Sequence, residues 1–113
     1  MSRRAWAAAI VFSASGILAS AGAGAADDPI SLTIKDHKFG PEEIRVPAGK
    51  AVVLKITNAD STPEEFESKA LKIEKVIAGG KDATVRLPAL KAGRYPFVGE
   101  YHEDTAKGVV IVE

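Results

Sequence analysis

The sequence contains no cysteine, and its single methionine and single tryptophan are Met1 and Trp6. Without thiols the protein has no disulfide bonds, no thiolate nucleophile and no cysteine ligand for a metal. Histidine is also scarce, with His37 and His102 as the two imidazoles. These absences exclude thiol redox chemistry, and they leave oxygen atoms and two imidazoles as the main donors for any metal.

Two further absences reduce the number of possible functions. The 113 residues carry 15 basic and 15 acidic side chains, without a basic stripe or an aromatic platform, so the composition argues against a nucleic acid partner. There is no G-x-S-x-G elbow and no glycine-rich phosphate loop, so no motif for nucleophilic catalysis or nucleotide binding is present.

The amino-terminal segment predicts export. Arg3 and Arg4 form a basic start, residues 5–19 are apolar and uncharged, and small residues with A-x-A spacing follow up to Ala26. We therefore expect residues 1–26 to be a cleaved signal peptide, with an uncleaved anchor as the weaker alternative, and residues 27–113 to be one domain in the periplasm. Removing Arg3 and Arg4 changes the formal net charge from 0 to about −2.

The remaining sequence has the pattern of short strands and turns. Apolar and polar residues alternate over short runs, and glycine, proline or asparagine separates these runs. Residues 71–77 fit a helix or a strand, and the Gly79-Gly80 turn after them favours a strand. We predict an all-β protein, an antiparallel sandwich of seven to eight short strands, with Pro96 in an edge or irregular strand. The predicted strands cover residues 30–34, 43–46, 51–57, 71–77, 83–87, 94–98 and 108–112.

An acidic segment at residues 63–68 is the first candidate site. In extended backbone Glu65 and Glu67 point to one face, while Phe66 points to the other and anchors in the core. Two adjacent carboxylates repel each other unless a cation relieves them. The segment is therefore either a pair of metal-binding carboxylates or a solvated acidic loop.

The second candidate site surrounds His102. Glu100, Glu103 and Asp104 lie within two residues of this imidazole, and imidazole with carboxylate is a frequent set of metal donors. The alternative is a charged turn in which the histidine has no special role. His37, at the end of the first predicted strand, is a secondary candidate ligand.

These residues together resemble a known family. The pattern Tyr-x-Phe-x-Gly-x-x-His over residues 95–102, followed by the apolar run 108–112, is similar to the carboxy-terminal signature of cupredoxins. Residues 39–49 and 53–58 resemble the second strand of that family and the strand that leads to its first ligand loop. The resemblance implies a Greek-key cupredoxin-like β-sandwich over residues 27–113.

The departures from the cupredoxin pattern concern the copper ligands. Gly99 stands where the family has its cysteine ligand, and Ala106 or Lys107 stands near the methionine ligand. Glu65 or Glu67 stands near the first histidine, so His102 is the ligand that survives. A type 1 copper site requires a cysteine sulfur, which this sequence lacks.

A finer resemblance concerns iron. Residues 64–68, 74–75 and 99–106 are similar to those of the cupredoxin-like proteins of bacterial iron-uptake systems, the EfeO cupredoxin domain and the stand-alone FtrB type. This resemblance implies iron ions as ligand, a periplasmic iron-uptake partner and an Ftr-type iron permease of the inner membrane. Oxygen donors around one imidazole favour iron in either valence, manganese, zinc or Cu(II) over Cu(I).

Two hypotheses of different classes follow. In the first, Glu65, Glu67, Glu100 and His102, with Glu103 or Asp104, meet at one end of the sandwich and bind Fe(II), and a ferrous oxidase activity would be the enzymatic form of this hypothesis. In the second, the chain is a non-metal scaffold or interaction module whose acidic side chains are scattered and solvated. The relative positions of the two acidic segments distinguish these hypotheses.

Overall fold

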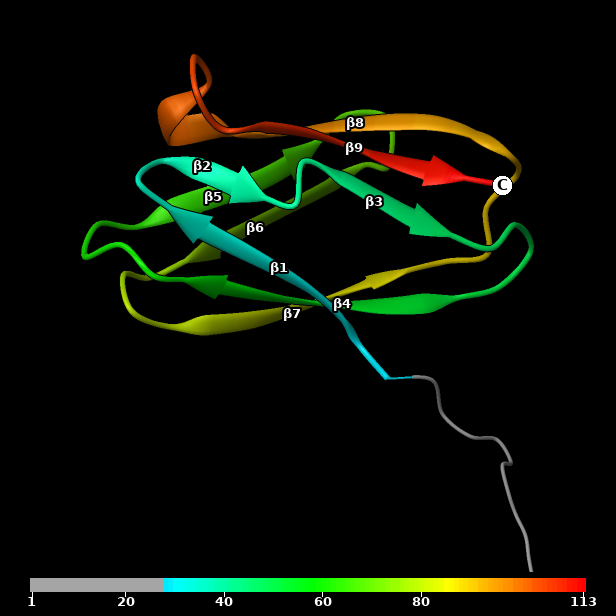
Figure 1. Cartoon of the computed structure of the whole chain (residues 1–113), viewed down its shortest axis with the longest axis horizontal. Helices are drawn as coiled ribbons and strands as arrows, with labels where there is room; N and C mark the ends of the chain where they lie inside the picture. Colours follow the sequence, from blue (N-terminus) through cyan, green and yellow to red (C-terminus); the bar gives the residue numbers. More distant parts are fainter. Residues whose placement is uncertain (1–27) are drawn as a thin grey trace, which may run out of the picture.

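A computed structural model describes residues 28–113, and the predicted signal peptide lies outside this described part. Within it, nine strands and one short 3₁₀ helix form a two-layer β-sandwich (Figure 1). No helix in the described residues is long and apolar enough to span a membrane. The elements are β1 (Ile30–Lys35), β2 (Lys38–Gly40), β3 (Glu43–Val46), β4 (Val52–Asn58), β5 (Glu64–Ser68), β6 (Ile73–Ile77), β7 (Asp82–Leu87), β8 (Gly93–Gly99), η1 (Glu100–His102) and β9 (Lys107–Val112).

The two sheets have the orders β2-β1-β4-β7 and β3-β9-β8-β5-β6. The prediction of an all-β sandwich is confirmed, but the prediction that it is wholly antiparallel is wrong, because β1 pairs with β4 and β3 with β9 in parallel. Parallel neighbours need a connection that crosses over. Here β3 provides one, since it leaves the first sheet for the second before β4 returns beside β1.

The core lies between the sheets and follows from the alternation along the strands. The burial pattern of β1 places Leu32 and Ile34 inside, and β4 does the same with Leu54 and Ile56. Three buried phenylalanines pack together in the core, with ring centroids 4.9–6.1 Å apart. Such aromatic pairs contribute about 0.5–1.5 kcal/mol each beyond their buried area. These rings belong to Phe39, Phe66 and Phe97.

Two strands were missed by sequence analysis, which raises the count from seven or eight to nine in the described residues. Residues 38–40 form the short strand β2 rather than a turn, because Asp36 and His37 form the β1–β2 turn with φ of 53° and 59°. Residues 64–68 form β5, a central strand, rather than a loop. Its inward positions include Glu64 and Ser68, so the usual apolar signal of a buried strand is missing.

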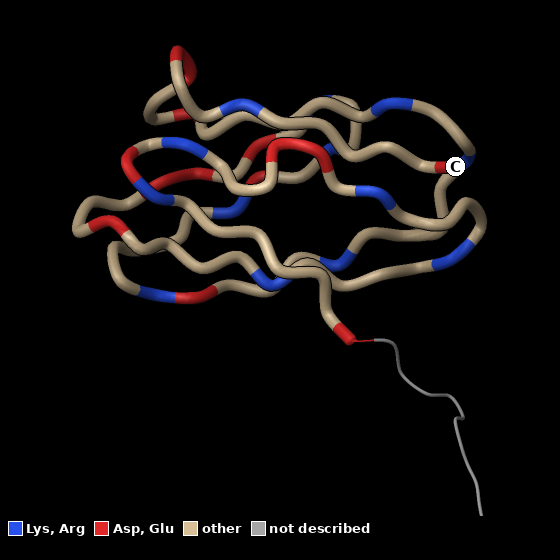
Figure 2. The backbone as a smooth tube through the Cα atoms, viewed as in Figure 1, with Lys and Arg blue, Asp and Glu red and all other residues tan. Residues whose placement is uncertain are grey.

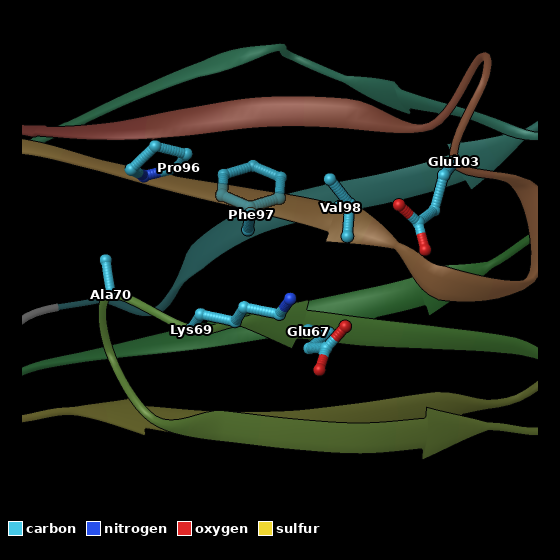
Figure 3. Close-up of a pocket in the computed structure, with 7 residues that line it drawn as sticks. All are labelled: Glu67, Lys69, Ala70, Pro96, Phe97, Val98 and Glu103. Atoms are coloured by element: carbon cyan, nitrogen blue, oxygen red, sulfur yellow. The ribbon is translucent and has the colours of Figure 1, made fainter.

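Strand β8, which contains Pro96, lies between β9 and β5, so the prediction of an edge strand is wrong. The prediction of irregular pairing is confirmed, because β5 and β8 pair at two positions only. Beyond them the Ser68 hydroxyl donates a hydrogen bond to the carbonyl of Pro96, at 2.7 Å. The gap between the strands forms a hollow of about 260 Å³ (Figure 3). Its lining comprises Glu67, Lys69, Ala70, Pro96, Phe97, Val98 and Glu103.

Candidate metal centre

Strand β5 divides its three glutamates between the two faces of the sheet. Glu64 points inward and is 1% exposed, whereas Glu65 and Glu67 point outward and are half-buried. Phe66 is fully buried, as the alternation predicts. Consecutive residues of one strand therefore supply carboxylates to two different environments.

The outward glutamates belong to a group that we call the acidic face, formed by Glu65, Glu67, Glu74 and Glu100. Glu67 and Glu74 are direct partners across the β5–β6 ladder, so their side chains are neighbours on one face. Carboxylate oxygens of Glu65, Glu74 and Glu100 all lie within 4.8 Å of one another. Acidic positions also gather at the end of the molecule that holds η1 and the β1–β2 turn (Figure 2). The spacing of at most 4.8 Å between the oxygens of Glu65, Glu74 and Glu100 is short enough for one cation to contact several carboxylates.

Mutual repulsion perturbs the acidic face. The hydrogen bond with Glu100, together with partial desolvation and the charge of Glu100, raises the pKa of Glu67. The contact with Glu65 raises the pKa of Glu100, and the charges of Glu65 and Glu74 add to this effect. Among the described residues, none of the four carboxylates forms an ion pair within 4.0 Å. A bound cation would relieve this repulsion.

A second group, which we call the histidine pole, consists of Glu64, His102 and His37. Nδ1 of His102 lies 2.5 Å from Oε2 of Glu64. The rings of His37 and His102 are stacked, with centroids 3.5 Å apart and an interplanar angle of 9°. Both histidines are half-buried. The structure therefore brings together two imidazoles that are 65 residues apart in the sequence.

Three loops position His37 in this stack. The backbone N–H groups of Asp36 and His37 donate hydrogen bonds of 2.8 and 3.0 Å to the carboxylate of Asp60. The hydroxyl of Thr105 donates a hydrogen bond of 2.6 Å to the carbonyl of His37. The two backbone hydrogen bonds lower the pKa of Asp60. Left-handed backbone is unfavourable for residues other than glycine, and these contacts stabilise it in the turn.

The seven residues proposed from the sequence are distributed between these places. Glu65, Glu67 and Glu100 meet on the acidic face, and His37 and His102 meet in the histidine pole. Glu103 lines the hollow together with Glu67 (Figure 3), and Asp104 is exposed.

Two residues of these groups, Glu64 and Glu74, were not predicted from the sequence as ligands or contacts. Glu74 was recognisable once its strand was paired with β5, because the register places it opposite Glu67. Glu64 was recognisable as well, because the alternation that places Phe66 in the core also places Glu64 on the inward face.

The site does not fit type 1 copper. Gly99 stands at the position that the cupredoxin resemblance gives to cysteine, and a Cβ built there would lie 2.8 Å from Cδ of Glu64 and 2.7 Å from Cβ of Ala106. The carboxylate of Glu64 thus occupies the space that a side chain at position 99 would need. The sequence also has no cysteine to supply the thiolate.

A comparison with known sequences finds a relative of this chain. A relative from Rickettsia prowazekii (strain Madrid E), an uncharacterized protein, is 45% identical over 83 residues, which are 74% of this chain and 66% of that protein. The match therefore spans slightly less than two thirds of the relative. Its name gives no function.

Solved structures show the same fold at lower identity. A methionine-to-alanine variant of amicyanin in the Cu(I) form is 22% identical with a TM-score of 0.62, and the match covers 80% of this chain and 87% of amicyanin. Auracyanin A, a "blue" copper protein from Chloroflexus aurantiacus, is 16% identical with a TM-score of 0.66, over 76% of this chain and 98% of auracyanin. A family model described as a cupredoxin-like domain matches residues 5–112. The chain is therefore a member of the cupredoxin-like domain family.

Proposed function

We propose that this protein is a periplasmic metal-binding component of a ferrous-iron uptake system, and that the acidic face captures Fe(II). The observation that carries the proposal is the convergence of Glu65, Glu74 and Glu100, with oxygens within 4.8 Å of one another and no ion pair among the described residues. The pKa values of Glu67 and Glu100 are raised because these carboxyl groups lie against one another, and the charge of Lys69 offsets the effect on Glu67 only in part. A divalent cation would supply further positive charge.

The donor set favours iron over the soft Cu(I) ion. The acidic face offers carboxylate oxygens, which are hard ligands. Several carboxylates stabilise Fe(III) more than Fe(II), so the same site would promote oxidation of bound iron. Oxidation removes one electron from each Fe(II), and an external acceptor such as Cu(II) or dioxygen must receive it. Binding and oxidation are therefore measured separately.

The place of the protein in transport rests on the resemblance to the FtrB type and on the predicted signal peptide. A periplasmic protein that binds iron would deliver it to an iron-uptake partner or to an Ftr-type permease in the inner membrane. Binding must then be reversible, which suits a partly exposed site better than a closed cage. Three of the four carboxylates of the acidic face come from strands, which hold them in fixed register.

Anaerobic titration with Fe(II) tests the proposal. We expect Glu67→Gln and Glu100→Gln to weaken Fe(II) binding at least about tenfold, which is the loss seen even for partners outside the ligand shell. Glu42→Gln is the control, because this exposed carboxylate forms no ion pair among the described residues. Oxidation is followed by the loss of Fe(II) with and without Cu(II).

Two outcomes contradict the proposal. Fe(II) binding only in the millimolar range, or equal binding by the wild type and both acidic-face variants, would mean that these carboxylates are solvated surface groups. The alternative of a non-metal scaffold predicts that result. It also predicts a melting temperature that added metal leaves unchanged, whereas a ligand of the folded state raises it by mass action.

A further inference from the structure

Glu64 is unusual because its charged group is buried beside Gly99, the position that the cupredoxin resemblance gives to the cysteine ligand. The residue is 1% exposed, and its Cδ would lie 2.8 Å from a Cβ at position 99. Burying a carboxylate is costly unless hydrogen bonds satisfy it. Its contacts therefore indicate both its protonation state and its role.

The contacts of Glu64 indicate an ionised carboxylate. Oε1 accepts hydrogen bonds from the backbone N–H groups of Tyr101, at 2.9 Å, and Glu65, at 3.0 Å. Oε2 lies 2.5 Å from Nδ1 of His102. Donors on the charged form stabilise that form, and an ionised carboxylate can only accept. It follows that Nδ1 of His102 carries a proton and donates a hydrogen bond to Oε2 of Glu64.

This arrangement determines which nitrogen of His102 can bind a cation. A neutral imidazole with a proton on Nδ1 has its lone pair on Nε2. Among residues 28–113, Nε2 has no hydrogen-bond partner, and the side chain of His102 is 28% exposed. Metal-binding histidines commonly donate their other ring N–H to a carboxylate in this way, which fixes the tautomer and the ring orientation.

We propose that Glu64 is a positioning residue that occupies the place of the sulfur ligand and holds His102 as the Nδ1–H tautomer, so that Nε2 is the nitrogen offered to a divalent cation. This inference rests on the proposed metal-binding function for its purpose, but its geometry can be tested without any metal. His37 covers one face of the His102 ring at 3.5 Å and limits its rotation.

Nitrogen NMR of the protein labelled with ¹⁵N-histidine gives the first test. The sequence has two histidines, so His37→Gln assigns the two sets of ring signals. In metal-free protein at pH 8 we expect His102 to show a protonated Nδ1 and an unprotonated Nε2. A proton on Nε2, or an equal mixture of tautomers, would overturn the proposal.

Glu64→Gln gives a sharper test, because it keeps the shape of the side chain. The amide oxygen must accept from Tyr101 and Glu65, which directs the amide NH₂ group to Nδ1 of His102. His102 must then accept at Nδ1 and carry its proton on Nε2, so we expect the tautomer to reverse. Retention of the Nδ1–H form in this variant would contradict the assigned role. If the variant does not fold, the wild-type spectrum still decides.

Zn(II), a diamagnetic probe, separates this inference from the proposed function. We expect Zn(II) to shift the Nε2 signal of wild-type His102 while Nδ1 keeps its proton. The matched control is Glu65→Gln, which should weaken metal binding and leave the tautomer of the metal-free protein unchanged. A correct tautomer with no response of His102 to bound Zn(II) would overturn the role of Nε2 and leave capture by the acidic face standing. The reverse result, a His102 response without Fe(II) affinity, would overturn iron capture alone.

Discussion

The acidic face and the histidine pole begin at neighbouring residues of β5, yet their carboxylates are in opposite situations. Glu64 is buried and has contacts with two backbone N–H groups and one imidazole nitrogen. Glu67 is half-buried, and its main contacts are the carboxyl groups of Glu100 and Glu74. The carboxylate of Glu64 is satisfied by hydrogen-bond donors of the protein, whereas that of Glu67 faces other carboxyl groups.

This difference shows which carboxylate can bind a cation. A carboxylate whose oxygens are already hydrogen-bonded gains little from a metal and loses its contacts when it moves. A group of carboxylates that repel one another gains free energy when a cation enters. We therefore assign capture to the acidic face and positioning to Glu64.

The largest expected effect comes from Gly99→Ala. The added Cβ would lie 2.7 Å from Cβ of Ala106 and 2.8 Å from Cδ of Glu64, both of which are buried. Overpacking of this kind typically costs about 1–3 kcal/mol, and displacement of the buried carboxylate adds to it, so we expect a loss at the upper end of that range. Urea unfolding should show a lower midpoint with an unchanged slope.

Gly93→Ala is the matched control, because Gly93 begins the same strand and a Cβ there meets its nearest neighbour at 3.6 Å. We expect its effect to stay within about 0.5 kcal/mol, as for other changes without a steric clash. A double variant with Glu64→Ala should cost less than the sum of the two single changes, because they compete for one space. Equal losses for Gly93→Ala and Gly99→Ala would show that Glu64 does not restrict position 99.

Most of the fold was predictable because hydropathy alternates along strands such as β1 and β4. The sandwich and the buried Phe66 followed from this signal. The strand at residues 73–77 was predicted within residues 71–77 because the Gly79-Gly80 turn follows it. Strand β5 was missed because its inward positions are polar at both ends, so alternation is hidden where the site lies. The parallel pairs were missed because periodicity gives no information about the order of strands.

The candidate site was predictable in composition but not in arrangement. Glu65 and Glu67 share a face by alternation, but the inclusion of Glu74 depends on the β5–β6 register, which sequence alone does not give. The stack of His37 on His102 depends on a left-handed turn that contains no glycine. A turn of this kind forms only because contacts from distant residues stabilise it.

The next effect in size is expected for Asp60→Ala. This change removes the acceptor of the N–H groups of Asp36 and His37, and each lost hydrogen bond costs about 0.5–1.5 kcal/mol. Hydrogen exchange at these two amides should accelerate, and the tautomer of His102 should remain. The pKa of Asp60 is lowered in the folded protein. Its contribution to the free energy of unfolding is therefore present above the ordinary pKa of 3.8, and it is lost as the pH falls through the lower pKa of the folded state.

Asp82→Ala is the control for this prediction, since Asp82 is an exposed acid whose ion pair with Lys55 measures 3.5 Å. Exposed pairs contribute about 0–1 kcal/mol, and no change at the β1–β2 turn is expected. If both variants alter exchange at Asp36 and His37 equally, Asp60 is not what stabilises the turn.

The smallest effect, and the one with a distinctive sign, is expected for Glu67→Gln. The pKa of Glu67 is raised in the folded state, so the folded protein binds its proton more tightly than the unfolded chain does. The stability of the metal-free protein should therefore fall as the pH rises from the ordinary pKa of 4.5 through the raised pKa of the folded state, and Glu67→Gln should reduce this fall.

Thermal unfolding at pH 7 should give the metal-free Glu67→Gln variant a slightly higher melting temperature than the wild type. Added Fe(II) under anaerobic conditions should reverse the order, because the wild type binds it more tightly. A variant that is less stable than the wild type without metal would mean that Glu67 stabilises the fold, and the contrast between a satisfied Glu64 and an unsatisfied acidic face would then be lost.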